Sequence, residues 1–467
     1  MTGSAHAPHP APAGPEQSFD RRLITPLILG SVLNPINSSI IAVSLVPIGE
    51  AFHAQPSQTA WLVSALYLAT AVGQPIVGRL IDIHGPRRLF LAGAGLVGIA
   101  GVLGVLAPDL GALIVARALL GLGTCAGYPA AMYLIGSEAR RTGSDSPATV
   151  LTALAIANQT MAVIGPTLGG LLIGVGGWRA TFAVNIPLSV ACLVLGALRL
   201  PRAKARQEGG RPTSRLDFMG MALFATTLVT LLLFLMSPSV ARWYLPALTA
   251  AAAAGLTVRE LRTSDPFIDL RVLGGNLPLL TTYCRNLLAM IVGYGFLYGY
   301  AQWLGEGRGL SAPTVGLVLL PLFLAALIAS AVGGRRIGVR ANLVAGAVAQ
   351  IAACVLLLVV HTDTAIWLLL AVALVMGLPQ GLNGLALQHA VYHQADPEHM
   401  ASSAGLLRTF TYLGAMISSA ATAAFYRQGA DTGGLRDLTV FMLVVAVLFL
   451  VTTLLDRTLS RVGAPRP

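Results

Sequence analysis

Residues 78–88 read GRLIDIHGPRR, and this short charged turn decides how the chain around it is built. On its two sides lie the apolar runs 58–80 and 87–107. Each run has close to the roughly 20 residues that a helix needs to cross a hydrocarbon core of about 30 Å. The two glycines of the turn permit a tight bend and a close approach of helices. The stretch therefore predicts two membrane-spanning helices joined by a short polar turn.

The same pattern of apolar runs and polar joints repeats along nearly the whole chain. The 467 residues are 55% hydrophobic and 10% charged, with a mean hydropathy of +0.75, whereas a soluble globular protein carries about 25% charged residues. A transmembrane β-barrel would show shorter segments of strict alternation. We therefore predict an all-α polytopic membrane protein with about fourteen transmembrane helices. The expected helices are 23–48, 58–80, 87–107, 110–136, 147–174, 179–199, 216–237, 241–260, 278–304, 311–332, 341–361, 364–391, 399–427 and 436–456.

The predicted helices divide into a 6+2+6 arrangement. Arginines gather in alternate joints, and the positive-inside rule then places these joints and both chain ends on the cytoplasmic side. We expect a multi-pass protein of a bacterial cytoplasmic (inner) membrane that functions as a monomer. The predicted segments are a disordered cytoplasmic tail at 1–20, an N-terminal six-helix bundle at 21–199, a basic cytoplasmic linker at 200–215, a central two-helix insertion at 216–260, a C-terminal six-helix bundle at 261–457 and a cytoplasmic tail at 458–467.

Several other classes of function find no support in the sequence. The formal charge of +11 is spread over the joints, so no compact basic domain offers a surface to nucleic acid. The four cysteines lie inside apolar runs and lack the spacing of metal ligands. The spans hold no nucleophile with an adjacent base, so we expect no catalytic residues, no metal, no cofactor and no enzyme activity.

The turn at 78–88 is similar to the signature G-x-L-x-D-x-x-G-r-r of the major facilitator superfamily. In that superfamily the acidic residue belongs to a conformational latch. From the residues alone, Asp82 can cap the following helix or pair with nearby arginines. The resemblance implies a major facilitator fold with a latch formed by Gly78, Asp82, Gly85, Arg87 and Arg88.

Four further stretches occur in the order of the fourteen-helix drug:proton antiporter family. Residues 113–123 (LIVARALLGLG) resemble l-x-x-x-R-x-x-x-G-x-G, and residues 178–187 (WRATFAVNIP) resemble W-R-x-x-F-x-x-N-x-P. Residues 265–271 (DPFIDLR) resemble the stretch before that family's ninth helix. Residues 165–170 (GPTLGG) resemble the antiporter motif G-P-x-x-G-G, which is thought to restrict leak and favour exchange. The matching positions are Gly165, Pro166, Gly169 and Gly170.

The sequence departs from the family in its first helix. Residues 36–46 read INSSIIAVSLV where the family carries L-D-x-[ST]-[IV]-V-N-V-A-L-P, so the embedded aspartate is replaced by Asn37. An asparagine cannot carry a proton or attract a cation. In addition, Ile83 takes the usual arginine position of the latch, and Leu120 replaces a common glutamine.

Three arginines fall inside predicted helices, at positions 117, 285 and 408. A charge at membrane depth costs at least about 2.5–3.5 kcal/mol, so each requires a partner or a wet cavity. We expect the three to line a central cavity and to hold the anionic part of a substrate. In the alternative reading, each satisfies backbone carbonyls or extends to a helix end. The expected substrate-binding residues are Arg117, Arg285, Arg408, Asn37, Asn158, Tyr294, Tyr298, Gln302 and Asn383.

Proton coupling has few candidates, because no acidic residue lies near the middle of a predicted helix. Histidine titrates in the right range, although a histidine at a helix end is more often structural. An anionic substrate would also couple transport to the membrane potential through its own charge. The candidates are Glu50, Asp82, His389 and His393.

The residues and the resemblance together predict a secondary active transporter in the lipid bilayer. It would export small amphipathic organic compounds, anionic or neutral, by alternating access and in exchange for protons. The resemblance supplies the direction of transport. Two alternatives are an organic-anion importer or facilitator without drug efflux, and a membrane receptor with a transporter-like fold, although no loop here approaches the size of a soluble domain.

Overall fold

The computed structural model describes residues 20–54, 56–142, 148–201, 217–236, 240–263, 267, 274–310, 312–336, 338–426, 429–456 and 459. Most of the expected tails and of the expected linker lie outside these ranges. Within them every regular element is a helix, which confirms the all-α class. The α-helices are α1 (Ile24–Phe52), α2 (Pro56–His84), α3 (Pro86–Leu106), α4 (Leu110–Thr124), α5 (Gly127–Thr142), α6 (Ala148–Ala183), α7 (Asn185–Arg199), α8 (Phe218–Met236), α9 (Tyr244–Arg262), α11 (Leu277–Gly295), α12 (Ala312–Arg336), α13 (Val339–Leu358), α14 (Ile366–Gln394), α15 (Met400–Phe425) and α16 (Thr432–Leu455).

Ten helices of the described chain are long and apolar enough to cross a membrane, or eleven if a bent pair forms one span. That pair is Leu168–Ala183 and Asn185–Arg199, bent by 46°. Within α6 the backbone turns at Gly177, whose φ of 66° is left-handed and favours glycine. α15 is not among the ten, because Arg408 and several serines and threonines lower its hydropathy. The multi-pass membrane class is confirmed, while the number fourteen stays a prediction.

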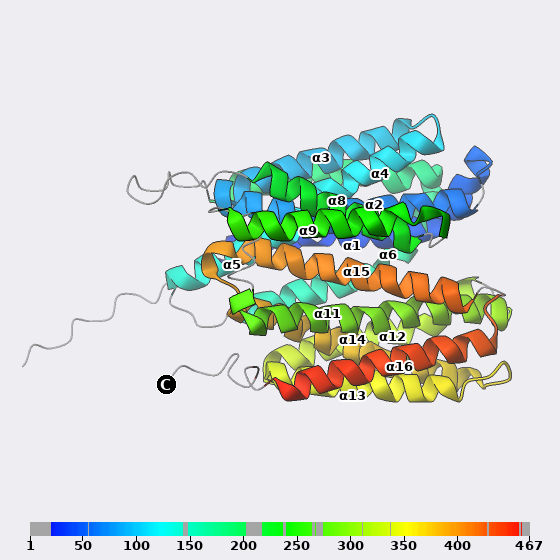
Figure 1. Ribbon diagram of the computed structural model, residues 1–467. Coiled ribbons are helices and arrows are strands. Elements are labelled where there is room, and N and C mark those ends of the chain that lie inside the picture. The colour runs from blue at the N-terminus through cyan, green and yellow to red at the C-terminus, as the bar shows by residue number, and fades with distance from the viewer. Residues whose placement is uncertain are drawn as a thin grey trace, which may run out of the picture.

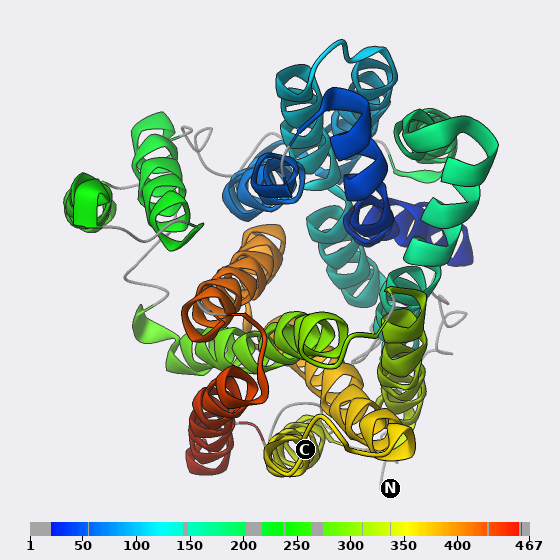
Figure 2. The ribbon, with the colours of Figure 1, turned by 90° about the vertical axis from the view of Figure 1, so that its right-hand side faces the viewer.

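The helices form two groups with a further pair at the side (Figures 1 and 2). In the first group, α1 packs on α6, α2 on α4, and α3 on both α4 and α7. In the second group, α14 packs on α12 and α13, and α16 packs on α11 and α13. α8 and α9 pack on each other, and α8 also contacts α2 and α15. The two groups meet along an α2–α15 seam and an α6–α12 seam, so helices distant in sequence form the boundary between the halves.

Two glycines set the distance between α2 and α15. A Cβ on Gly78 would lie 2.5 Å from the carbonyl oxygen of Ala401, and a Cβ on Gly405 would lie 2.6 Å from that of Gln74. Each helix therefore presents a glycine to the backbone of the other, which lets the two backbones approach closely. Along the same seam the Thr409 hydroxyl donates a hydrogen bond to the carbonyl of Ala71, at 2.8 Å.

The glycines of the antiporter-like motif lie on two different faces of α6. Gly165 and Gly169 face α1, where a Cβ would collide with Ser39 and with Val43 respectively. Gly170 is exposed, and a Cβ placed there meets nothing within 4 Å. Gly165 and Gly169 therefore bring α1 and α6 together inside the first half, whereas the surface of α6 at Gly170 is not covered by another helix.

The seam glycine Gly78 predicts a specific loss of stability on substitution. Gly78→Ala places a methyl group against the α15 backbone, and such overpacking costs typically about 1–3 kcal/mol. Gly170→Ala is the matched control, because it carries the same gain in helix propensity at an open position. We expect Gly78→Ala to lower the thermal unfolding midpoint in detergent below that of Gly170→Ala. Equal midpoints for the two variants would contradict the close seam contact.

Candidate functional site

The Asp82 carboxylate binds the beginning of a helix in the other half of the protein. It accepts hydrogen bonds from the backbone N–H groups of Ala401 (3.1 Å) and Ser402 (2.9 Å), and from the Ser402 hydroxyl. α15 begins at Met400, so these N–H groups belong to its first turn and have no partner within the helix. A carboxylate is also stabilised there by the helix dipole. Asp82 therefore caps α15 across the seam, which differs from both of the local roles that the sequence suggests.

The other latch residues shape the turn between α2 and α3. Gly85 has a φ of 84°, in the left-handed region, directly before the proline that begins α3. Arg87 donates from Nη2 to the carbonyl of Ala197 on α7, at 2.8 Å, and Arg88 is exposed. These two arginines bind within the first half or face outward, whereas Asp82 and Gly78 contact the beginning of α15 in the second half.

Arg117 on α4 is held by backbone carbonyls inside the first half. Its side chain is 2% exposed, and it donates from Nε to Leu62 at 2.9 Å and from Nη1 to Asn37 at 3.3 Å. The Asn37 amide in turn donates to the Asn185 side chain at 2.7 Å. Arg117 and Asn37 thus connect α1, α2, α4 and α7. Asn185 completes this network, and its place in the stretch 178–187 was the only sign of it in the sequence.

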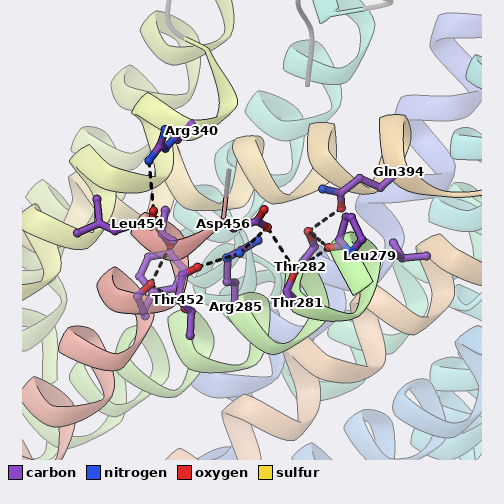
Figure 3. A network of polar contacts seen from close by, with 12 residues as sticks. Leu279, Thr281, Thr282, Arg285, Arg340, Gln394, Thr452, Leu454 and Asp456 are labelled. Atoms are coloured by element: carbon purple, nitrogen blue, oxygen red, sulfur yellow. Dashed lines mark hydrogen bonds and ion pairs between the residues drawn. The ribbon is translucent and has the colours of Figure 1, made fainter. Parts of the chain in front are cut away.

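Arg285 on α11 lies against the end of α16 (Figure 3). It is 1% exposed, and its Nη2 lies 2.7 Å from Oδ2 of Asp456 and 2.9 Å from the carbonyl of Thr452. Asp456 follows the last residue of α16, and no pattern in the sequence indicates it as the partner of Arg285. Arg285 therefore has a carboxylate of its own within the second half.

Arg408 is the embedded arginine that reaches across the boundary between the halves. Its guanidinium lies over the ring of Tyr128 on α5, 4.2 Å from the centroid, in a cation–π contact. It also interacts electrostatically with Tyr294, a half-buried tyrosine next to the last residue of α11. The rings of Tyr294 and Tyr298 are 5.6 Å apart, one helical turn from each other. Arg408 thus combines a charge with aromatic surface from both halves.

A second group of polar and aromatic side chains also lies at the boundary between the two halves. The Tyr412 hydroxyl on α15 donates to the Asn34 side chain on α1 at 2.9 Å, and the rings of Tyr412 and Tyr67 are 5.5 Å apart. Tyr67 also interacts with Tyr298 through their side chains. We call Tyr67, Tyr128, Tyr294, Tyr298 and Tyr412 the tyrosine cluster. Together with Arg408 it supplies hydrogen-bonding groups, a charge and apolar ring faces in one region.

Three expected substrate-binding residues have no described contact with this region. Asn158 donates to the carbonyl of Leu154 one turn earlier on its own helix, at 2.8 Å. Gln302 is exposed and donates to the Glu306 side chain at 3.2 Å. Asn383 is 1% exposed, and its amide faces Gly346 of α13 within the second half. Of the nine expected residues, the structure brings Arg408, Tyr294 and Tyr298 together at the boundary.

The candidates for proton coupling are distributed along the bundle. Glu50 is exposed and lies near the last residue of α1. His389 is half-buried on α14, and its Nε2 has no hydrogen-bond partner among the described residues. The ring of His393 packs edge-on against that of Tyr392, at 5.4 Å between centroids. Asp82 is thus the one candidate of the four whose carboxylate joins the two halves.

The capping role of Asp82 predicts that removing its charge favours separation of α2 from the beginning of α15. Hydrogen bonds to charged groups are worth about 1.5–3 kcal/mol each, so Asp82→Asn should raise the population with separated helices on the order of tenfold. Thr409 is buried in the seam, so a Thr409→Cys probe reports this opening by its rate of maleimide labelling after the native cysteines are replaced. Arg88→Gln, an exposed change in the same turn, should leave the rate unaltered. Slow labelling in both variants would show that Asp82 does not hold the seam.

Comparison with known proteins identifies a family and several relatives of this chain. The family model of the Major Facilitator Superfamily matches residues 27–419. The chain is 33% identical over 404 residues to the uncharacterized MFS-type transporter YwoD of Bacillus subtilis, covering 85% of this chain and 88% of that one. It is 26% identical over 424 residues to the multidrug efflux pump LfrA of Mycolicibacterium smegmatis, covering 87% and 81%.

A solved structure shares the fold at low sequence identity. The human organic anion transporter MFSD10 (TETRAN) superposes with a TM-score of 0.69 over 93% of this chain and 100% of that chain, at 16% identity. A likeness at this identity concerns the fold alone. The family match over most of the chain, joined to the two helical halves and the Asp82 cap between them, shows that this protein belongs to the major facilitator superfamily of membrane transporters.

Proposed function

We propose that the protein is a secondary active transporter that exports small amphipathic organic compounds, anionic or neutral, by alternating access and in exchange for protons. The observation that carries this proposal is the cap that Asp82 forms on α15. It fastens the two halves at one end through three hydrogen bonds to a single carboxylate. Contacts of this kind can break and re-form without disturbing the packing inside either half. The name of LfrA as an efflux pump supports the outward direction.

We further propose the fourteen-helix topology of the drug:proton antiporters, in a 6+2+6 arrangement with both chain ends in the cytoplasm. The bend at Gly177 supports it, because it separates most of α6, which matches the helix expected at 147–174, from the end of α6 and α7, which match the helix expected at 179–199. The lateral position of α8 and α9 supports the role of the central pair as an insertion between two bundles. In this topology the latch lies at the cytoplasmic end and the protein acts as a monomer in the bacterial inner membrane.

We propose that the substrate binds at Arg408 and the tyrosine cluster. Arg408 offers a guanidinium to a carboxylate or phosphate, and the tyrosine rings offer apolar faces with hydroxyl groups at their edges. Arg117 and Arg285 are already bound to backbone carbonyls and to Asp456. Their contacts support the alternative role that the sequence left open for embedded arginines, and Arg408 is the arginine we assign to the substrate.

Transport in proteoliposomes tests the function and the charge preference together. Fluorescein and rhodamine 6G share a xanthene ring and carry opposite charge, so they form a matched anionic and cationic pair. We expect uphill movement of fluorescein driven by an imposed pH gradient, and at least a tenfold lower flux in Arg408→Gln, since loss of one charge-assisted hydrogen bond costs about 1.5–3 kcal/mol. Arg242→Gln alters an exposed arginine outside the two halves and serves as the control.

The outcomes separate the parts of the proposal. Movement of rhodamine 6G alone, unaffected by Arg408→Gln, would exclude an anionic substrate and leave an ordinary multidrug antiporter. Fluorescein uptake without any outward transport would favour the organic-anion importer. Failure to move either dye under any gradient, with the protein folded, would count against export of compounds of this class.

A further inference from the structure

A buried ion pair in the second half differs from the other ion pairs of the described residues. In the Arg141–Glu138 and Arg259–Asp217 pairs the arginine side chains are 46% and 39% exposed. In the Arg285–Asp456 pair the arginine is 1% exposed, and the atoms are 2.7 Å apart. Withdrawing an arginine from water is expensive, and a buried pair contributes little net stability. A role in stability alone does not account for this pair.

The guanidinium of Arg285 is compensated incompletely. Its Nη2 makes both of the contacts described above, to Asp456 and to the carbonyl of Thr452. Its Nε and Nη1 have no hydrogen-bond partner among the described residues. An arginine does not lose its proton in a protein. The positive charge of Arg285 is therefore permanent, and the negative charge that compensates it is the carboxylate of Asp456.

Asp456 is the member of the pair that can change its charge. It caps the end of α16, and its side chain is 12% exposed, which gives water a path to the carboxylate. On α11, Thr281 lies within 3.4 Å of its Oδ2. On α13, Arg340 donates to the carbonyl of Leu454, two residues earlier, at 3.2 Å. The charged group of α15, Arg408, lies over the Tyr128 ring. The charged side chains named here on the helices packed against α16 are thus arginines.

α11 connects this ion pair to α15, the helix that Asp82 caps. From residues beside Arg285 on the same helix, the Tyr283 hydroxyl donates to the carbonyl of Ser403 at 3.0 Å. The Asn286 amide donates to the carbonyl of Leu407 at 2.8 Å. Ser403 follows directly after the serine that binds Asp82. One face of α11 therefore holds the ion pair, and its other face is fixed to the first turns of α15.

We infer that Asp456 is a proton-binding site of the transport cycle, with Arg285 as its counter-charge. This inference rests on the proposed function and supplies its missing proton carrier. A proton from water adds to the carboxylate and gives a neutral carboxyl group, which ends the ion pair. Arg285 is then a buried cation without compensation, so α11 and α16 separate until it is solvated. That movement reaches α15 through Tyr283 and Asn286, and release of the proton to water reverses it.

The experiment uses the full-length protein in proteoliposomes, with fluorescein as the probe. Asp456→Asn mimics the protonated state, so we expect pH-driven accumulation to fall at least tenfold. Exchange of labelled for unlabelled probe at equal concentrations needs no net proton movement and should stay within about threefold of wild type. Asp456→Glu keeps a carboxyl group and should retain accumulation. Asp437→Asn, an exposed carboxylate on the same helix, is the matched control.

A second readout does not depend on transport. We expect the infrared difference spectrum between acidic and neutral pH to contain a carboxyl band that is lost in Asp456→Asn and shifted in Asp456→Glu. If wild type carries no dye, the proposed function fails while this band still decides the proton site. Full pH-driven accumulation in Asp456→Asn, or an unchanged carboxyl band in that variant, would overturn the inference.

Discussion

The Asp82 carboxylate on the first turn of α15 is the contact on which the relation of the two halves depends. The free N–H groups of a helix end require partners wherever water is scarce, and Asp82 supplies them from a helix of the opposite half. Gly78 and Gly405 allow the backbones to come close enough for this capping to occur. The hydrogen bond of Thr409 and the packing of Tyr412 then follow along the same seam.

The three embedded arginines show three ways of keeping a charge inside a helical bundle. Arg117 donates to backbone carbonyls, Arg285 pairs with a carboxylate, and Arg408 lies on an aromatic ring. The first arrangement fixes neighbouring helices through backbone acceptors. The second can be altered by a single proton. The third leaves the guanidinium able to meet another anion, because a ring face neutralises a charge only in part. If our proposals hold, the same residue type serves architecture at Arg117, coupling at Arg285 and recognition at Arg408.

The sequence was sufficient for the features that depend on local composition. The membrane class and the positions of most helices follow from apolar runs, and the left-handed turn at Gly85 agrees with the motif that contains it. The partners of the polar residues were not predictable. Asp82 binds residues more than 300 positions away, and Asn37 binds Asn185, 148 positions along the chain. Asp456 is the last residue of the predicted helix 436–456, and nothing in the apolar pattern indicates that the fold places it beside Arg285.

The position of α8 has a consequence for how solutes dissolved in the lipid can reach the interior. Leu232 of α8 packs against Ala71 of α2 and against Tyr412 and Met416 of α15, so an apolar helix covers the outside of the α2–α15 seam. A hydrophobic molecule that diffuses within the bilayer meets this helix before it meets the boundary between the halves. On this flank α8 therefore lies between the lipid and the α2–α15 seam, whereas the α6–α12 seam has no α8 beside it.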